Sequence, residues 1–425
     1  MNQNAHKPGS LPVPDADARA ASEALVALVR EDIAAAGGWL PFDRYMERVL
    51  YAPRLGYYSG GARKFGARAE DGSDFITAPE LSPFFASTLA RPVAQALAAS
   101  GTRDLIEFGA GTGKLAAGLL NALDALGVAF DSYAIVELSG ELRARQRETI
   151  EALAGDLAKR VRWLDALPET FAGVALGNEV LDAMPVKLFV RTGGAWHERG
   201  VALAADGKPS FADRRVAGSS GGTNGARDTE TEGGCAADGI ALAEYEAAVL
   251  AELDAQLDPS LDYVAETHAA AAAFTRTICT MLSRGAAFFV DYGFPRHEYY
   301  HPQRAQGTLM CHYRHHSHVD PFFYPGLQDI TAHVEFTAIA LAGTEAGADL
   351  LGYTSQARFL MNAGITDALA GLDVSDTSRF LPAANAVQKL LSEAEMGELF
   401  KVIAFSRGID GTLDAFARGD RSHTL

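Results

Sequence analysis

Short hydrophobic runs alternate with longer segments of helical spacing through the middle and the end of the chain. Apolar runs of about four to eight residues predict buried strands, and the helix-length segments between them predict crossover connections. Strands joined in this way form a mostly parallel sheet, so we expect an α/β fold. The predicted strands are Asp104–Gly109, Ser132–Leu138, Val161–Leu164, Val174–Asn178, Ala286–Tyr292 and Phe400–Ser406.

The N-terminal part of the chain has a different pattern. Residues 1–20 mix Pro, Ala and Asp and are expected to form a disordered tail. Apolar residues at helical spacing from Ala21 to Arg48, interrupted by Gly37-Gly38, predict two helices. The glycine- and proline-rich stretch Tyr51–Pro83 is typical of a lid, so residues 21–100 are assigned to an N-terminal helical lid region.

An insertion is predicted between the fourth and fifth strands, because about a hundred residues lie there and a crossover helix needs far fewer. We place the inserted subdomain at residues 183–285 and the α/β domain at residues 101–182 and 286–425. Within the insertion, the low-complexity loop 217–239 cannot bury enough apolar area to become ordered, and we expect it to be mobile. A long helix is predicted at Ile240–Leu257.

Charge and cysteine content narrow the function classes. The 425 residues include 37 Lys and Arg against 54 Asp and Glu, a formal net charge of −17, which disfavours nucleic-acid binding and favours cationic partners. The 3 cysteines are scattered, which argues against a disulfide framework and for a reducing compartment. No apolar run reaches the ~18 residues of a membrane span, and no targeting segment is recognisable. We expect a cytoplasmic protein that binds no membrane; its oligomeric state stays open.

A glycine-rich turn follows the first predicted strand. Glu107-Phe108-Gly109-Ala110-Gly111-Thr112-Gly113 places three glycines where the backbone takes positive φ or approaches a ligand closely. A phosphate-binding P-loop is excluded because Leu115 stands where Ser or Thr is required, and a dinucleotide fingerprint has Lys114 in place of its third glycine. The carboxylate of Glu107 suits a cationic cofactor without phosphate, S-adenosylmethionine. A tight turn without a ligand is the alternative.

Acidic residues follow the second and third predicted strands. Glu137, next to Leu138, ends the second strand, where a carboxylate can accept both ribose hydroxyls of a nucleoside. Asp165, after the third strand, is expected to reach the adenine amine. The alternatives are a solvated strand end for Glu137 and a helix N-cap for Asp165.

A second acidic motif follows the fourth strand. Glu179 and Asp182 are three residues apart, so in a helical turn their carboxylates would lie on one face, beside Asn178. Paired carboxylates beside a methyl donor favour a cationic acceptor, and arginine fits best because its planar guanidinium binds carboxylates bidentately. Alignment and electrostatics would then supply most of the catalysis. The alternative is a capped helix start with solvated acids.

Together, these motifs and several others resemble the MidA family of S-adenosylmethionine-dependent methyltransferases, which includes a mitochondrial complex I assembly factor. The resemblance extends over about residues 40–407. It is carried, in this order along the chain, by Gly56–Tyr58, Asp74–Ser82, Glu107–Ala116, Ile135–Gln146, Gly177–Val186, Val290–Phe294, Gln306–His316, Asp329–Phe336 and Leu351–Leu360.

The resemblance implies a Rossmann-like, seven-stranded class I methyltransferase sheet with an N-terminal helical lid and an insertion between strands 4 and 5. It also implies protein arginine N-methylation linked to the assembly of a protein complex, so the partner would be a protein with an accessible arginine. By motif match, Gly109, Gly111, Gly113 and Glu137 would hold the cofactor, and Glu80 and Asn178 would line its pocket. The chain departs from the mitochondrial member in lacking a recognisable transit peptide.

The last candidates lie in the C-terminal half of the chain. His333 is a candidate catalytic residue that could relay the proton lost by the acceptor, although a packed histidine is nearly as plausible a reading. Asp291 and Tyr292 end a strand at the same sheet edge and are predicted to form the walls of the acceptor site. Seven of the 11 histidines lie between His297 and His333, but without a fixed ligand spacing we predict no metal site.

Two other functions are compatible with the sequence. One is an assembly factor or chaperone that has the methyltransferase fold, binds a basic partner and performs little or no catalysis. The other is methylation of a small molecule. The number and symmetry of transferred methyl groups do not follow from these motifs.

Overall fold

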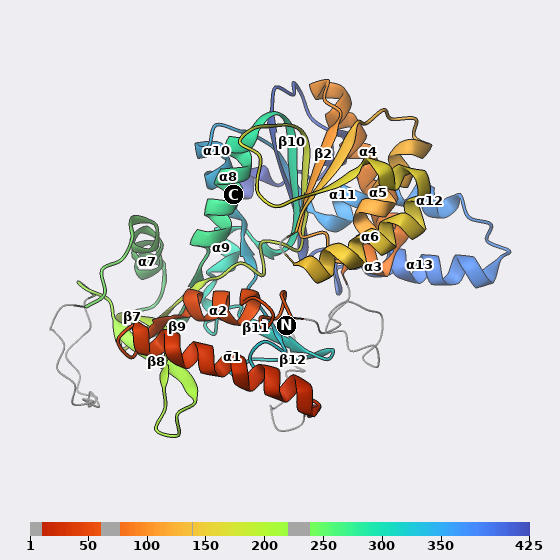
Figure 1. Ribbon diagram of the computed structural model, residues 1–425. Coiled ribbons are helices and arrows are strands. Elements are labelled where there is room, and N and C mark those ends of the chain that lie inside the picture. Colours follow the sequence, from red (N-terminus) through yellow and green to blue (C-terminus); the bar gives the residue numbers. More distant parts are fainter. Residues whose placement is uncertain (1–10, 61–76, 138, 220–238) are drawn as a thin grey trace. The chain divides into compact units, whose positions relative to one another are not determined.

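The computed structural model describes residues 11–60, 77–137, 139–219 and 239–425 (Figure 1). It divides into two compact units, each built from three stretches of the chain. The first unit comprises residues 1–60, 184–270 and 297–332, and the second comprises 61–183, 271–296 and 333–425. This division differs from the predicted one, because the N-terminal helices and residues 297–332 belong with the insertion, and helix α4 (Pro83–Ser100) belongs with the main sheet.

The main sheet of the second unit has the strand order β15-β16-β10-β5-β2-β3-β4, and β14 also pairs with β10. Strands β10, β5, β2, β3 and β4 run parallel to one another, whereas β16 is antiparallel to β10 and β15, so the sheet is mixed. The bounds are β2 Asp104–Phe108, β3 Ser132–Val136, β4 Val161–Leu164, β5 Phe171–Asn178, β10 Leu282–Phe294, β14 Val334–Glu335, β15 Asp349–Ser355 and β16 Phe400–Arg407. All six predicted strands are present.

Helices cover both faces of this sheet (Figure 1). One face packs under α4, α5 and α11 through a continuous apolar core that includes Leu105, Tyr133 and Phe288. On the other face, Phe274 of α8 contacts Phe108 and Phe289 edge to face. The helices of the second unit are α3 Ala78–Leu81, α4, α5 Lys114–Ala125, α6 Gly140–Ala154, α8 Ala269–Met281, α10 Phe336–Glu345, α11 Gln356–Asn362, α12 Ile365–Ala370 and α13 Thr377–Leu391, with 3-10 turns Gly155–Arg160, Asp414–Phe416 and Ser422–Thr424.

The first unit contains two smaller sheets. One has the order β1-β7-β6-β9 with β8 beside β7, and the other has the order β12-β11-β13. The strands are β1 Leu40–Pro41, β6 Lys187–Thr192, β7 Ala195–Leu203, β8 Pro209–Arg215, β9 Tyr263–Thr267, β11 Met310–Tyr313, β12 His316–His318 and β13 Asp329–Thr331. The helices are α1 Ala16–Ala35, α2 Phe42–Tyr51, α7 Glu244–Gln256 and α9 Arg296–Tyr299, with a 3-10 turn Pro302–Arg304.

Two predicted boundaries are wrong for local reasons. Helix α1 begins at Ala16, inside the expected tail, because the Asp15 side chain caps it by accepting the Ala18 N–H at 2.8 Å. Helix α7 begins at Glu244 instead of Ile240, because Ile240 forms an isolated bridge with Val216. Most of the predicted mobile loop, residues 220–238, lies outside the described residues. Within the described part of the chain, no helix is long and apolar enough to span a membrane.

Candidate functional site

The glycine-rich turn joins β2 to α5 at the carboxyl edge of the main sheet, and its three glycines have the predicted backbone conformation. Their φ angles are +65° at Gly109, +53° at Gly111 and +88° at Gly113. A Cβ atom at Gly113 would lie 3.1 Å from the Cα of Gln146, so α6 packs directly against the turn. Glycine is therefore required there both for its positive φ and for close approach of a neighbouring helix.

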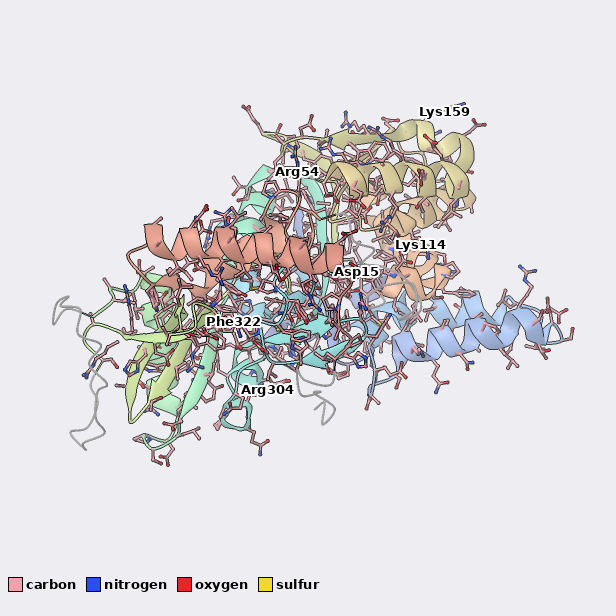
Figure 2. All side chains as sticks on the ribbon, turned by 60° about the horizontal axis from the view of Figure 1, so that its bottom comes forward. Asp15, Arg54, Lys114, Lys159, Arg304 and Phe322 are labelled. Carbon is pink, nitrogen blue, oxygen red and sulfur yellow. The ribbon has the colours of Figure 1, made fainter. Side chains whose placement is uncertain are left out.

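Glu80 lies beside this turn. Glu80 belongs to the short helix α3. Its carboxylate accepts a hydrogen bond from the Thr112 hydroxyl, and its Oε2 lies 2.6 Å from the Lys114 Nζ. Lys114 is the first residue of α5 and is labelled in Figure 2. Lys114 occupies the position of the third glycine in a dinucleotide-binding motif. In this structure it pairs with a residue of another helix.

Glu107 is directed into the core and not toward the open side of the turn. Its side chain is buried, and its Oε2 accepts a hydrogen bond of 2.7 Å from the Tyr133 hydroxyl on β3. Burial raises the pKa of Glu107 to about 7, although the Tyr133 hydrogen bond opposes the shift. The buried Glu107 therefore links β2 to β3 through Tyr133, and its attraction to a cofactor cation stays a prediction.

The Glu107 pKa leads to a stability prediction. The group binds its proton more tightly in the folded state, at a pKa of about 7, than at the usual 4.5, so folding stability falls as pH rises from about 4.5 to about 7. Glu107→Gln removes this titration and should recover up to about 3 kcal/mol relative to wild type above pH 7. Urea unfolding of both proteins at pH 5 and pH 8 measures the effect; an equal pH dependence in the two proteins would contradict it.

Glu137 is held at the end of β3, next to the glycine turn. Its Oε1 accepts the Ser139 N–H at 2.8 Å, and its Oε2 accepts a hydrogen bond of 3.1 Å from the Gln146 side-chain amide. The same amide donates to the Gly111 carbonyl at 3.1 Å. Glu137 and the turn are therefore connected through one side chain. Its neighbour Leu138 lies outside the described residues.

Asp165 follows β4 and is almost fully exposed. Its Oδ1 forms an ion pair of 2.7 Å with Arg143 of α6, whose guanidinium also donates to the carbonyls of Glu137 and Leu164. Arg143 therefore links the ends of β3 and β4. The structure brings Asp165 to the sheet edge through Arg143, and its contact with an adenine amine stays a prediction.

The acidic motif after β5 does not form the expected helical turn. Glu179 has a φ of +52°, a left-handed conformation that is uncommon for a residue with a side chain, and no helix includes residues 179–182. The Glu179 N–H donates to the Val290 carbonyl of β10 at 2.8 Å. The prediction that Glu179 and Asp182 share a helix face is therefore wrong.

Asp291 explains this conformation. Its side chain is fully buried, and its Oδ2 accepts the backbone N–H groups of Val180, Leu181 and Asp182 at 3.1, 2.8 and 3.3 Å. Burial raises the Asp291 pKa, and the nearby carboxylates of Asp182 and Glu179 raise it further. The Asp291 carboxylate therefore holds the backbone of the acidic motif, and its role as a wall of the acceptor site stays a prediction.

Asp182 is the buried acid that has hydrogen-bonding capacity to spare. Its Oδ2 accepts a hydrogen bond of 2.5 Å from the Tyr292 hydroxyl, whereas its Oδ1 is buried without a hydrogen-bond partner among the described residues. Burial raises the pKa of Asp182 to about 6. Asn178 likewise donates to Glu179 Oε1 at 3.1 Å and leaves its own Oδ1 buried and unpartnered within the described chain. Two buried acceptors of this kind fit a ligand that carries several N–H donors.

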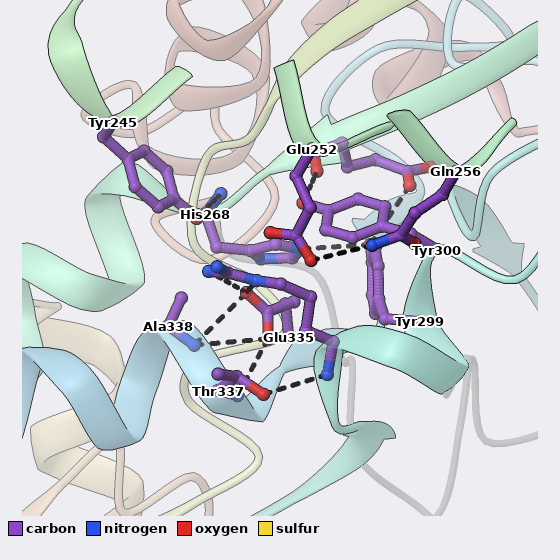
Figure 3. Close-up of polar contacts among 11 residues, drawn as sticks. Tyr245, Glu252, Gln256, His268, Tyr299, Tyr300, Glu335, Thr337 and Ala338 are labelled. Carbon is purple, nitrogen blue, oxygen red and sulfur yellow. Dashed lines mark hydrogen bonds and ion pairs between the residues drawn. The ribbon is translucent and has the colours of Figure 1, made fainter. Parts of the chain in front are cut away.

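His333 completes a row of side chains that includes Tyr292 and Asp182. Its ring lies 5.3 Å from the Tyr292 ring and 5.4 Å from the Phe294 ring, measured between centroids. Two residues later, the buried Glu335 caps α10 by accepting the N–H groups of Thr337 and Ala338, and Arg296 pairs with it at 3.0 Å (Figure 3). The structure thus brings His333 to the predicted site and fixes the chain just after it.

Two of the other histidines, His318 and His268, pack against aromatic rings. His318 is buried and its ring packs 5.3 Å from Phe323. His268 of the first unit lies 3.0 Å from the Tyr299 hydroxyl, which also donates to Glu266 at 3.1 Å (Figure 3). No group of three or more His, Cys, Asp or Glu side chains within the described ranges could hold a metal ion.

Sequence reasoning missed four residues that shape the site, namely Thr112, Tyr133, Arg143 and Gln146. Arg143 and Gln146 lie within the motif Ile135–Gln146, so their position in a conspicuous motif was the available signal. Thr112 lies within the glycine-rich motif, which was its signal, whereas Tyr133 has a partner that is distant in the sequence and no local pattern marks it.

Comparisons with known proteins show the family. A family model described as "Putative S-adenosyl-L-methionine-dependent methyltransferase" matches residues 88–354. Protein arginine methyltransferase NDUFAF7 homolog, mitochondrial, from Caenorhabditis elegans is 27% identical over 358 residues, which cover 79% of this chain and 75% of that protein. Its counterpart from Danio rerio is 26% identical over 399 residues, 86% of this chain and 83% of that protein.

A solved structure is more similar. A superfamily protein from Burkholderia thailandensis, crystallised with S-adenosyl-homocysteine, is 69% identical, with a TM-score of 0.88 and coverage of 98% of this chain and 100% of that chain. The family match covers more than half of the chain, and the likeness to the solved structure extends over nearly all of it. This chain belongs to the family of S-adenosyl-L-methionine-dependent methyltransferases that its MidA motifs predict.

Proposed function

We propose that this protein is an arginine N-methyltransferase that modifies another protein, in a role linked to the assembly of a protein complex. The names of the Caenorhabditis and Danio relatives support this acceptor, and so does the charge at the acidic motif. We also propose that the path β15-β16-β10-β5-β2-β3-β4 is the seven-stranded class I sheet, with α1 and α2 as the lid region and β6–β9 in the insertion.

The cofactor residues are grouped at the carboxyl ends of β2, β3 and β5. The three turn glycines allow close backbone approach, Glu137 would accept the ribose hydroxyls, and Asn178 Oδ1 is free to accept an N–H from the cofactor's ammonium group. Glu80 supports the turn through Thr112 and Lys114. When bound, S-adenosylmethionine supplies an electrophilic methyl group on a sulfonium.

The observation that best supports the arginine proposal is the buried carboxylate of Asp182, which lacks a cationic partner among the described residues. Its Oδ1 is buried and unpartnered, a second buried carboxylate, Asp291, lies close by, and neither residue has an ion pair in the described part of the chain. Buried charge of this kind is costly unless a cation compensates it. A guanidinium supplies both the positive charge and several N–H donors in a fixed plane.

Asp182 can also take the proton that the acceptor loses. The acceptor nitrogen forms a bond to the methyl carbon, the carbon–sulfur bond breaks with its electron pair on sulfur, and one N–H proton must leave. A carboxylate with a pKa of about 6 is a suitable base near neutral pH. Tyr292 holds Asp182 in place, and His333, beside Tyr292, would pass the proton onward.

Methyl transfer to protein tests the function. The purified chain is incubated with S-adenosylmethionine labelled in its methyl group and with a lysate of a strain that lacks this protein. Label should enter the protein fraction, and it should be absent when the chain is omitted. Label found only in small molecules would overturn the proposal in favour of a small-molecule acceptor.

The hydrogen bond from Tyr292 leads to a pH prediction. It lowers the Asp182 pKa, so its removal in Tyr292→Phe should raise that pKa above about 6. The carboxylate form is the active one, so the kcat/KM of wild type should decrease when the pH drops below about 6. In the variant, this decrease should begin about one pH unit higher. Initial rates from pH 5 to pH 9 measure both decreases; superimposable profiles would exclude Asp182 as the titrating group.

The relatives named above are described as mitochondrial. A cytoplasmic location for this chain is a proposal that rests on its cysteine usage. Fractionation of the source cells, followed by detection of the protein with an antibody, is its test.

A further inference from the structure

Gln146 of α6 forms hydrogen bonds with the segments that follow β2 and β3 and with β4 itself. Its side chain is fully buried. The amide Nε2 donates to the Gly111 carbonyl and to Glu137 Oε2, each at 3.1 Å, and the Oε1 accepts the indole N–H of Trp163 at 2.8 Å. One amide therefore joins the glycine turn after β2, the acidic end of β3, and β4.

The partners determine the orientation of this amide. An indole nitrogen only donates, so the amide oxygen must face Trp163. The Gly111 carbonyl and the Glu137 carboxylate only accept, so both amide hydrogens point to them. No other side chain of similar length offers two donors and one acceptor in this arrangement. A glutamate would place an acceptor against two acceptors, and a methionine would leave all three partners unpaired.

The position of Gln146 also depends on the turn itself. A Cβ at Gly113 would lie 3.1 Å from the Gln146 Cα and 3.2 Å from its carbonyl oxygen, so nothing larger than glycine lets α6 approach this far. The bond to Gly111 fixes one peptide of the turn, and the bond to Glu137 fixes one carboxylate oxygen. Both are groups that the proposed cofactor site uses.

We propose that Gln146 is a positioning residue for cofactor binding, which orients Glu137 and the glycine turn before the nucleoside part of the cofactor arrives. Groups held in their bound geometry lose less entropy on binding, and this raises affinity without a direct contact. The inference rests on the proposed cofactor role of Glu137. It does not depend on the identity of the methyl acceptor.

The test measures S-adenosyl-homocysteine binding by calorimetry, without an acceptor. Gln146→Met should weaken binding by about 10- to 100-fold, because two hydrogen bonds to the site are lost. Gln146→Glu should bind S-adenosyl-homocysteine still more weakly at pH 8. Its affinity should increase at least severalfold toward pH 5, where the protonated carboxyl can donate to Glu137. The affinity of Gln146→Met should show no recovery beyond that of wild type over the same range.

Trp163→Phe keeps the proposal testable if Gln146→Met fails to fold. This variant removes the donor that orients the amide and keeps an aromatic ring at this position, and it should weaken binding about three- to tenfold. Where Gln146→Met folds, the double variant with Glu137→Gln should lose less affinity than the product of the two single losses, because the Gln146–Glu137 hydrogen bond is shared by both changes. Wild-type affinity in Gln146→Met, or a Gln146→Glu affinity that does not respond to pH, would overturn the proposal. A failure of arginine methylation alone would leave it standing.

Discussion

Asp182→Asn is expected to reduce kcat for methyl transfer at least about 100-fold while S-adenosyl-homocysteine binding stays within about threefold of wild type. The amide has nearly the shape of the carboxylate and can still accept the Tyr292 hydrogen bond. It cannot carry the negative charge that holds a guanidinium, and it cannot take up the proton. The loss should therefore fall on acceptor binding and chemistry and spare cofactor binding.

Folding does not confound this variant. Burial raises the Asp182 pKa to about 6, which means that the ionised side chain costs stability at neutral pH, so an uncharged amide should leave the protein at least as stable. Asp156→Asn is the matched control, since the Asp156 side chain is 93% exposed and pairs with Lys159, which Figure 2 labels on the surface. Single-turnover rates and thermal unfolding of wild type, Asp182→Asn and Asp156→Asn separate a loss of catalysis from a loss of stability. A wild-type rate in Asp182→Asn would remove this residue from the mechanism.

Gly111→Val is expected to weaken S-adenosyl-homocysteine binding by at least about 100-fold. Gly111 has a φ of +53°, which a β-branched residue adopts only at a cost of roughly 1–2 kcal/mol, and its carbonyl is tied to Gln146. The turn must then either keep the strain or move away from its cofactor-binding conformation. An added side chain also occupies space that close backbone approach requires.

Gly127→Val provides the matched control for backbone strain. Gly127 has a φ of +68°, lies in the turn after α5, and has no atom within 4 Å of an added Cβ. Both variants should lose similar stability in thermal unfolding, whereas only Gly111→Val should lose affinity in calorimetry. Equal loss of affinity in both would show that general destabilisation is responsible, and unchanged binding in Gly111→Val would disprove the assignment of the turn.

Local patterns predicted the sheet well because they act over short distances. Strand β4 has the bounds that its apolar run indicated, Val161–Leu164. The positive φ of the turn glycines followed from their residue type and place after a strand. Short strands such as β14 and β12, two or three residues long, carry no periodicity that a sequence pattern could reveal.

The site was only partly predictable because its hydrogen bonds join residues that are far apart in the sequence. Asp291 and Val180 are 111 positions apart, and no pattern near either residue indicates that one carboxylate holds three N–H groups of the other segment. The left-handed conformation of Glu179 follows from that contact and from the Val290 hydrogen bond, so a helical turn was the reasonable but wrong expectation. Residue type marked these acids as a group of candidates, whereas only the structure shows that Asp182, Asp291 and Glu107 have different hydrogen-bond partners.

The proposed function depends on which residue receives the methyl group. Labelled protein from the lysate reaction is digested, and mass spectrometry identifies the side chain that carries the label, with wild type and Asp182→Asn compared at equal concentration. Methylated arginine in the wild-type reaction, reduced at least about 100-fold in the variant, is the predicted result. Label on another residue type, or no label on protein while cofactor binding is intact, would contradict the proposed arginine methyltransferase.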